Sequence, residues 1–354
     1  MTQNEIFAQR LKNARVMKGY SMDELVSAMG NSLSKMAISK YEKCQLSPSS
    51  TVLISLSKAL GQPVDYFFRP FTMQIESVKF RKHKSKLAVK QEESIRQNIS
   101  DMFERYITIE EICNASVKFV SPFKKPVSSA EQVKEAALKL RDFWNIGNDG
   151  IINVIDLLEE HGIKVIEIDA PESFDGLSSM VNDFYPVIVL NKAFSSERKR
   201  FTALHELGHL ILNFDDSVSE KDEETLCNLF ANEMLILESM FRRIVGDSRR
   251  EITYPELRAV QIHFGISCDA LMYKAKDCGI ISEPRYKSYC IQKNRNSAFK
   301  ERIEQSYYPQ EESNRFNRLV YNALSNELIT ISKAASLLQT SVEKVQEDLI
   351  IFAN

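Results

Sequence analysis

The order of apolar and polar residues predicts a chain built mainly from helices, with one short region of strands. Along most of the chain, apolar residues recur every three to four positions, which places them on one buried face of a helix. Residues 163–168 instead alternate as a half-buried strand, and residues 187–190 form a more fully buried one. Residues 176–180 indicate a third strand, exposed at the edge of the sheet. We therefore predict an α+β fold that is mostly α.

The first 70 residues predict a bundle of four short helices. These helices are expected near residues 5–18, 22–29, 34–42 and 51–60. Ser21 and Glu24 have the spacing of a capping box at the start of the second helix. Two short helices joined by a tight turn can place the second of the pair in the major groove of DNA. The third predicted helix exposes basic and hydroxyl side chains, which suit that role.

The rest of the chain divides into three further parts. We predict an N-terminal domain at residues 1–70, a helical connector at 71–126, a central domain at 127–280 and a C-terminal helical domain at 281–354. The connector begins with a basic run at 78–86 and continues as a long helix, because residues 87–113 contain neither Gly nor Pro.

Charge is distributed unevenly along the chain. The net charge is only −2, yet residues 1–90 carry 15 Lys and Arg against 6 Asp and Glu. A basic N-terminal part on an acidic body indicates that this part binds a polyanion. Residues 300–354 hold 6 basic and 8 acidic residues. For this C-terminal part, dimerisation or covering of the central domain is therefore favoured over contact with DNA.

The composition places the protein in the cytoplasm without a membrane partner. No run of 18 apolar residues occurs, and the first 17 residues lack the apolar core of a signal peptide. The six cysteines include no Cys-x-x-Cys pair, so neither a disulfide framework nor a cysteine zinc site is predicted.

Residues 201–212 contain the most specific chemical signal in the chain. Their apolar spacing predicts a helix, on which His205 and His209 lie one turn apart on the same side. Two such imidazoles can bind one zinc ion, and Glu206 beside them can take a proton from water; this is the HExxH arrangement of zinc peptidases. Packed core histidines are the simpler alternative. It is disfavoured because two of only five histidines in the chain fall in this motif.

A third protein ligand is expected from the helix that follows, at about residues 219–234. On this helix Glu224 and Asn228 share one face, so Glu224 can complete the site while Asn228 hydrogen-bonds a ligand histidine. On the residues alone, three nearby acidic residues remain alternative ligands: Glu220, Asp222 and Glu223.

The N-terminal domain resembles the Cro/repressor (XRE-like) helix-turn-helix family, on the evidence of residues 10–15, 20–25, 38–42 and 60–67. The resemblance implies double-stranded DNA as a partner. It places Lys35, Met36, Ala37 and Lys40 at the groove, with Ser34 and Ser39 near phosphates. Two residues depart from the family pattern, Met22 in place of a Gln that contacts the DNA backbone and Cys44 in place of a Gly. Fewer phosphate contacts are therefore expected, with affinity weaker or shared across a homodimer.

The central domain resembles the ImmA/IrrE family of zinc metallopeptidases, a gluzincin-like group. The likeness rests on residues 175–176, 189–191, 200–210 and 224–231 and extends through 264–267. It implies a Zn²⁺ cofactor, a zincin-like fold and endopeptidase activity on a repressor or antitoxin-like protein. It also implies Glu224 rather than its acidic neighbours as the third ligand. Cys227 stands where the family has Ala.

Two questions stay open at the level of sequence. A non-proteolytic transcription factor that uses the peptidase fold as a ligand or stress sensor is the alternative function, although such a sensor has no need of Glu206. The side chain that stabilises the oxyanion is also undetermined, because spacing does not choose among Tyr185, His161, Tyr254 and His263.

Overall fold

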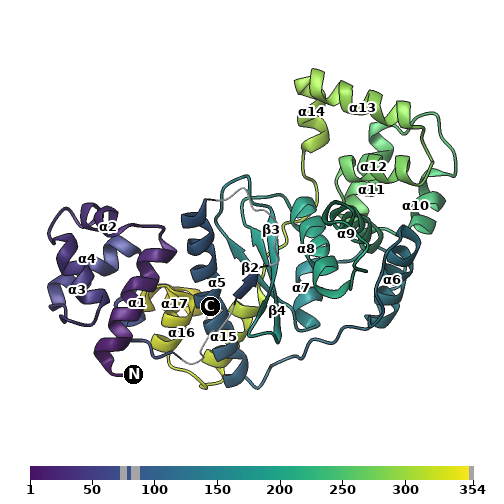
Figure 1. The fold of residues 1–354 in the computed structure, drawn as a ribbon. Coiled ribbons are helices and arrows are strands. Elements are labelled where there is room, and N and C mark those ends of the chain that lie inside the picture. The colour runs from purple at the N-terminus through teal and green to yellow at the C-terminus, as the bar shows by residue number, and fades with distance from the viewer. Residues whose placement is uncertain (72–77, 81–87, 351–354) are drawn as a thin grey trace. The chain divides into compact units, whose positions relative to one another are not determined.

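The computed structural model describes residues 1–71, 78–80 and 88–350, and it confirms a mostly helical α+β fold (Figure 1). These residues form two compact units. The first unit contains residues 1–71, 78, 88–117 and 314–350, and the second contains residues 79–80 and 118–313. The predicted basic run at 78–86 falls largely outside the described residues. The boundaries of the four predicted domains stay a prediction.

The first unit begins with the predicted bundle of short helices. Its elements are α1 (Gln3–Met17), α2 (Met22–Ala28), α3 (Lys35–Glu42), α4 (Ser50–Leu60) and the 3-10 helix η1 (Val64–Phe68). The capping box at α2 is formed, since Ser21 Oγ accepts from the Glu24 amide at 3.1 Å and Glu24 Oε2 accepts from the Ser21 amide at 2.6 Å. The buried residues of these elements make one apolar core, which includes Phe7, Leu25 and Phe67.

The long helix α5 (Val89–Ile112) joins this bundle to the C-terminal helices of the same unit. Arg10 of α1 forms a buried ion pair with Glu104 of α5 at 2.8 Å. The C-terminal helices are α15 (Arg315–Ser325), α16 (Ile331–Leu338) and α17 (Val342–Ile350). They share an apolar core with α5, in which the rings of Tyr106 and Phe316 lie 5.7 Å apart.

The second unit contains a small sheet and most of the remaining helices. In chain order its elements are α6 (Ala130–Phe143), α7 (Val154–Glu160), β2 (Lys164–Ile168), β3 (Gly176–Val181), β4 (Tyr185–Asn191), α8 (Ser196–Ile211), α9 (Glu220–Leu235), α10 (Glu238–Val245), α11 (Tyr254–Phe264), α12 (Cys268–Asp277), α13 (Glu283–Arg295) and α14 (Ser297–Glu304).

The sheet has the strand order β1–β3–β4–β2, where β1 is Val78–Phe80. Strand β2 is parallel to β4, and β3 is antiparallel to β4. The expectation that residues 176–180 form an edge strand is wrong, because β1 lies next to β3. The alternation of side chains within a strand predicts that it pairs but does not reveal which distant segment becomes its neighbour.

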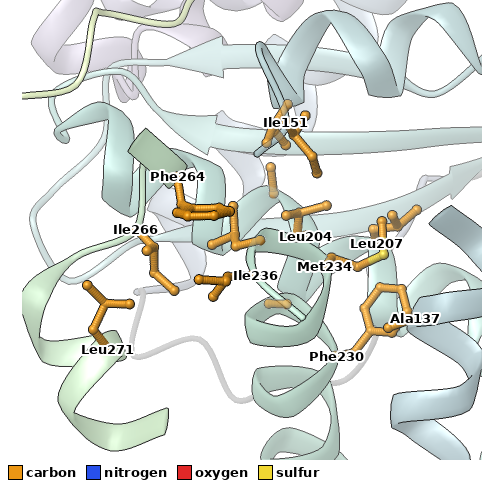
Figure 2. Packing of buried hydrophobic residues seen from close by; sticks show 14 of the residues in the cluster. Ala137, Ile151, Leu204, Leu207, Phe230, Met234, Ile236, Phe264, Ile266 and Leu271 are labelled. Atoms are coloured by element: carbon orange, nitrogen blue, oxygen red, sulfur yellow. The ribbon is translucent and has the colours of Figure 1, made fainter. Parts of the chain in front are cut away.

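Helices α8 and α9 pack closely in the core of the second unit. Leu204 and Leu207 of α8 lie among the same buried side chains as Phe230 and Met234 of α9 (Figure 2). Gly208 allows this approach, because a Cβ atom at that position would meet Cys227 Sγ and a Phe230 ring carbon at 3.3 Å. The polar residues of α8 are thereby brought against one face of α9.

Candidate metal centre

Helix α8 brings His205 and His209 together as the sequence predicts. Their Nε2 atoms are 3.1 Å apart, and the two rings meet edge to face with centroids 4.8 Å apart. His209 is fully buried, whereas the His205 side chain is 14% exposed. One side of the pair is therefore open to solvent, as an ion that must also contact substrate requires.

Glu224 of α9 reaches both imidazoles. Its Oε2 lies 3.3 Å from His205 Nε2 and its Oε1 lies 3.3 Å from His209 Nε2. The donor atoms of these three residues all lie within 4.8 Å of one another. Ligand atoms around a tetrahedral zinc ion with bonds of about 2.0–2.1 Å are about 3.3 Å apart. The three side chains therefore fit zinc in both chemistry and spacing.

Glu206 is buried beside this cluster but does not take part in it. Its side chain is almost fully buried, and its Oε2 atom has no hydrogen-bond partner within the described chain. A buried carboxylate oxygen without a partner is costly to stability, so such an atom calls for an explanation. An oxygen that accepts a proton during a reaction provides one.

The nitrogen of His209 that faces away from the cluster contacts α9. Its Nδ1 lies 3.2 Å from Glu223 Oε1 and 3.4 Å from Cys227 Sγ. A carboxylate at this nitrogen can accept a hydrogen bond from Nδ1–H, which fixes the tautomer and leaves the Nε2 lone pair free to bind a metal. Glu223 is an alternative ligand on the sequence alone. In the structure it contacts the far nitrogen of His209 and is not part of the three-residue cluster. The spacing of four residues between Glu223 and Cys227 could have indicated this shared face.

Asn228 does not make its predicted hydrogen bond to a ligand histidine. The residue is exposed, Glu223 and Cys227 occupy the space at His209 Nδ1, and His205 Nδ1 has no partner in the part of the chain that the structure describes. This expectation is corrected because Glu223 and Cys227, which lie one turn apart on α9, face His209, whereas Asn228 faces solvent.

Three of the four candidates for stabilising an oxyanion are engaged elsewhere. His161 stacks on Trp144 at 4.3 Å, the Tyr254 hydroxyl donates to the Arg302 carbonyl at 3.1 Å, and His263 contacts Asp149 at 2.7 Å. Tyr185 is half-buried at the start of β4. The oxyanion donor therefore stays unassigned.

Buried polar contacts hold the first half of α8, ahead of the metal cluster. The fully buried Arg200 donates to Glu311 and to the carbonyls of Ile151, Phe264 and Gly265 at 2.8–3.1 Å. Burial raises the pKa of Glu311, and the positive charge of Arg200 partly offsets this increase. These contacts fix the position of the helix that bears both histidines.

The six residues predicted to contact DNA lie on or next to α3. Ser34 caps the helix through its hydroxyl, while Lys35, Met36 and Lys40 are exposed. Ala37 and Ser39 are half-buried, so part of each side chain remains available for contact with DNA. Lys35 pairs with Asp23 at 2.6 Å, and both side chains are more than half exposed. Ile38 and Tyr41 face the core, so the basic face of α3 is turned outward.

Two separate parts of the chain match known family models. Residues 11–67 match a helix-turn-helix family model, and residues 158–276 match the model of the IrrE N-terminal-like domain, Peptidase_M78. The chain therefore has an N-terminal XRE-type helix-turn-helix domain, followed by an IrrE/ImmA-like domain of the metallopeptidase type. No curated protein matches the chain. Among the described helices, none is long and apolar enough to span a membrane.

Proposed function

We propose that the protein is a cytoplasmic DNA-binding transcriptional regulator whose second unit is a zinc-dependent endopeptidase. Its substrate would be a repressor or antitoxin-like protein, and cleavage would relieve repression. The strongest support is the convergence of His205, His209 and Glu224 beside the unpartnered carboxylate oxygen of Glu206. A helix-turn-helix domain in the same chain would place the enzyme at an operator.

Each residue of the cluster has a separate task in this proposal. His205, His209 and Glu224 would hold Zn²⁺, which would supply Lewis-acid polarisation of the peptide carbonyl and of the attacking water. Glu206 accepts the proton of that water through Oε2 and then returns it to the leaving amine. Glu223 accepts a hydrogen bond from Nδ1–H of His209, which holds the proton on Nδ1 and leaves the Nε2 lone pair available for a metal.

A fragment assay tests the proposal. The zinc-loaded full chain is incubated with the repressor-like and antitoxin-like proteins encoded beside its gene, and the products are identified by mass spectrometry. We expect one of these proteins to be cut in a reaction that a chelator stops. If every candidate protein and the chain itself stay intact, the non-proteolytic sensor becomes the better description. Fragments of the chain itself would instead identify self-cleavage.

Loss of the Glu223 carboxylate should weaken zinc binding without removing a ligand. We expect Glu223→Ala to lower zinc affinity about 10–100-fold, because partners of ligand histidines typically contribute that much. Competition with a chromogenic chelator measures the affinity directly. Glu220→Ala is the matched control, because it removes the same charge from the exposed start of the same helix. An equal loss in both variants would show that only overall charge matters.

The exposed face of α3 predicts a salt-dependent contact with DNA. Lys40→Ala should weaken binding to duplex DNA and reduce the slope of log K against log salt by about 1, as expected for one lost phosphate contact. Lys35→Ala should have a smaller effect, because Lys35 already pairs with Asp23. Titrations at several salt concentrations measure the slope. Lys58→Ala, on the exposed side of α4, should leave it unchanged.

A further inference from the structure

The first unit contains an open pocket, lined by both apolar and polar atoms, away from the face of α3. It has a volume of about 360 Å³ and lies between the end of η1 and the start of α16. Its lining residues are Asp65, Phe68, Arg69, Ser332, Lys333 and Ser336. Two stretches far apart in sequence thus supply two cations and two hydroxyl groups to one small space.

Arg69, which lines this pocket, has unused hydrogen-bond donors beneath the surface. The residue is only 8% exposed, and its Nη2 atom pairs with Asp101. Its Nε and Nη1 atoms are buried and have no hydrogen-bond partner within the described chain. Buried guanidinium donors without partners are costly, and their planar arrangement matches the oxygens of a phosphate or carboxylate.

The charges around Arg69 do not balance. Arg10, Arg69 and Arg105 share two carboxylates, those of Asp101 and Glu104. Three guanidinium groups against two carboxylates leave one positive charge in excess in a largely buried cluster. An anion in the adjoining pocket would neutralise it.

Lys333 adds a second cation to the same space. It is half-buried in the first turn of α16 and makes no ion pair with any residue that the structure describes. Burial and then the nearby charge of Arg69 lower the pKa of Lys333, and the Glu104 carboxylate partly offsets this decrease. Both cations line the same pocket. Asp65 is exposed and offsets one of these charges. The pocket and its cluster therefore remain net positive.

We propose that this pocket binds a small molecule that bears a phosphate group. Lys333 would donate from its ammonium group and Ser332 or Ser336 from a hydroxyl, and the buried guanidinium of Arg69 would attract the anion through its positive charge. A phosphate ester has a charge of about −1.5 to −2 and three acceptor oxygens, which suit these donors. The volume leaves room for a group attached to the phosphate. Because Arg69 is buried, a small anion that enters the pocket is favoured over the backbone of a DNA duplex.

Binding of simple probes by the full chain tests this site. Calorimetric titrations use inorganic phosphate, adenosine 5′-monophosphate and adenosine, at an ionic strength held constant with sodium chloride. We expect both phosphate-bearing probes to bind and adenosine not to bind. Lys333→Met should weaken the binding at least tenfold and leaves the Arg69–Asp101 pair in place. Lys344→Met, which removes an exposed lysine from the neighbouring helix α17, should bind as the wild type does.

Three results would overturn the site. The first is that phosphate gives no binding heat beyond that of chloride. The second is that Lys333→Met binds phosphate as tightly as the wild type. The third is that the wild type binds neither phosphate probe while Lys333→Met weakens binding to duplex DNA, which would identify Lys333 as a DNA contact. Arg69→Gln provides a second variant, and its folding is checked by circular dichroism because Asp101 loses a partner.

Discussion

Glu206→Gln is expected to keep zinc bound and to slow peptide-bond cleavage by at least about 100-fold, the low end of what general acid–base catalysis contributes. The substituted amide has nearly the same shape as the carboxylate, so the packing around this buried side chain is preserved. It cannot accept a proton from water. Because Glu206 is not among the three residues whose donor atoms converge, metal content should not change. Zinc analysis and cleavage of the protein cut by the wild-type chain measure the two effects separately.

Glu224→Gln is the matched control for that experiment. It makes the same chemical change one helix away, at a residue whose oxygens lie 3.3 Å from both imidazoles. We expect this variant to lose zinc and activity together. If Glu206→Gln instead cleaves at the wild-type rate, another group activates the water. If it loses zinc, Glu206 acts as a ligand rather than as a base.

The sequence predicted the centre of the site because its main signal is local. Helical periodicity alone puts His205 and His209 on one side, and the structure brings them together. Glu224 lies on a separate helix. The residues alone therefore did not distinguish it from its acidic neighbours as the third ligand, and only the family resemblance did. The predicted ligands converge, but their binding of zinc stays a proposal.

The parts that the sequence did not predict depend on contacts between distant segments. Asn228 and Glu223 are both plausible partners for His209, and the orientation of α9 against α8 decides between them. In the same way, no local pattern indicates that β1 pairs beside β3 or that Lys333 and Arg69 line one pocket. Propensity and spacing describe one element at a time, whereas these features arise only when two elements meet.

Arg200 is the best example of such a distant contact, and Arg200→Ala is expected to have the largest effect on stability. The substitution leaves Glu311 buried without its counterion and removes the donors to three backbone carbonyls. Breaking a buried ion pair by removing one partner costs about 3–5 kcal/mol. That is a large share of the free energy of unfolding of a typical domain, about 5–15 kcal/mol. Trp144 is the single tryptophan of the chain and is buried in the second unit, so its fluorescence during denaturant unfolding reports on this unit alone.

Arg198→Ala separates this buried contact from a general loss of positive charge on α8. Arg198 lies two residues earlier and pairs with Asp175 at 2.6 Å, but both side chains are about half exposed. Exposed pairs contribute at most about 1 kcal/mol, so this variant should unfold close to the wild type. A similar free energy of unfolding for both variants would mean that the Arg200 contacts do not hold α8 in place. The positions of His205 and His209 would then have to depend on the apolar packing of α8 against α9 alone.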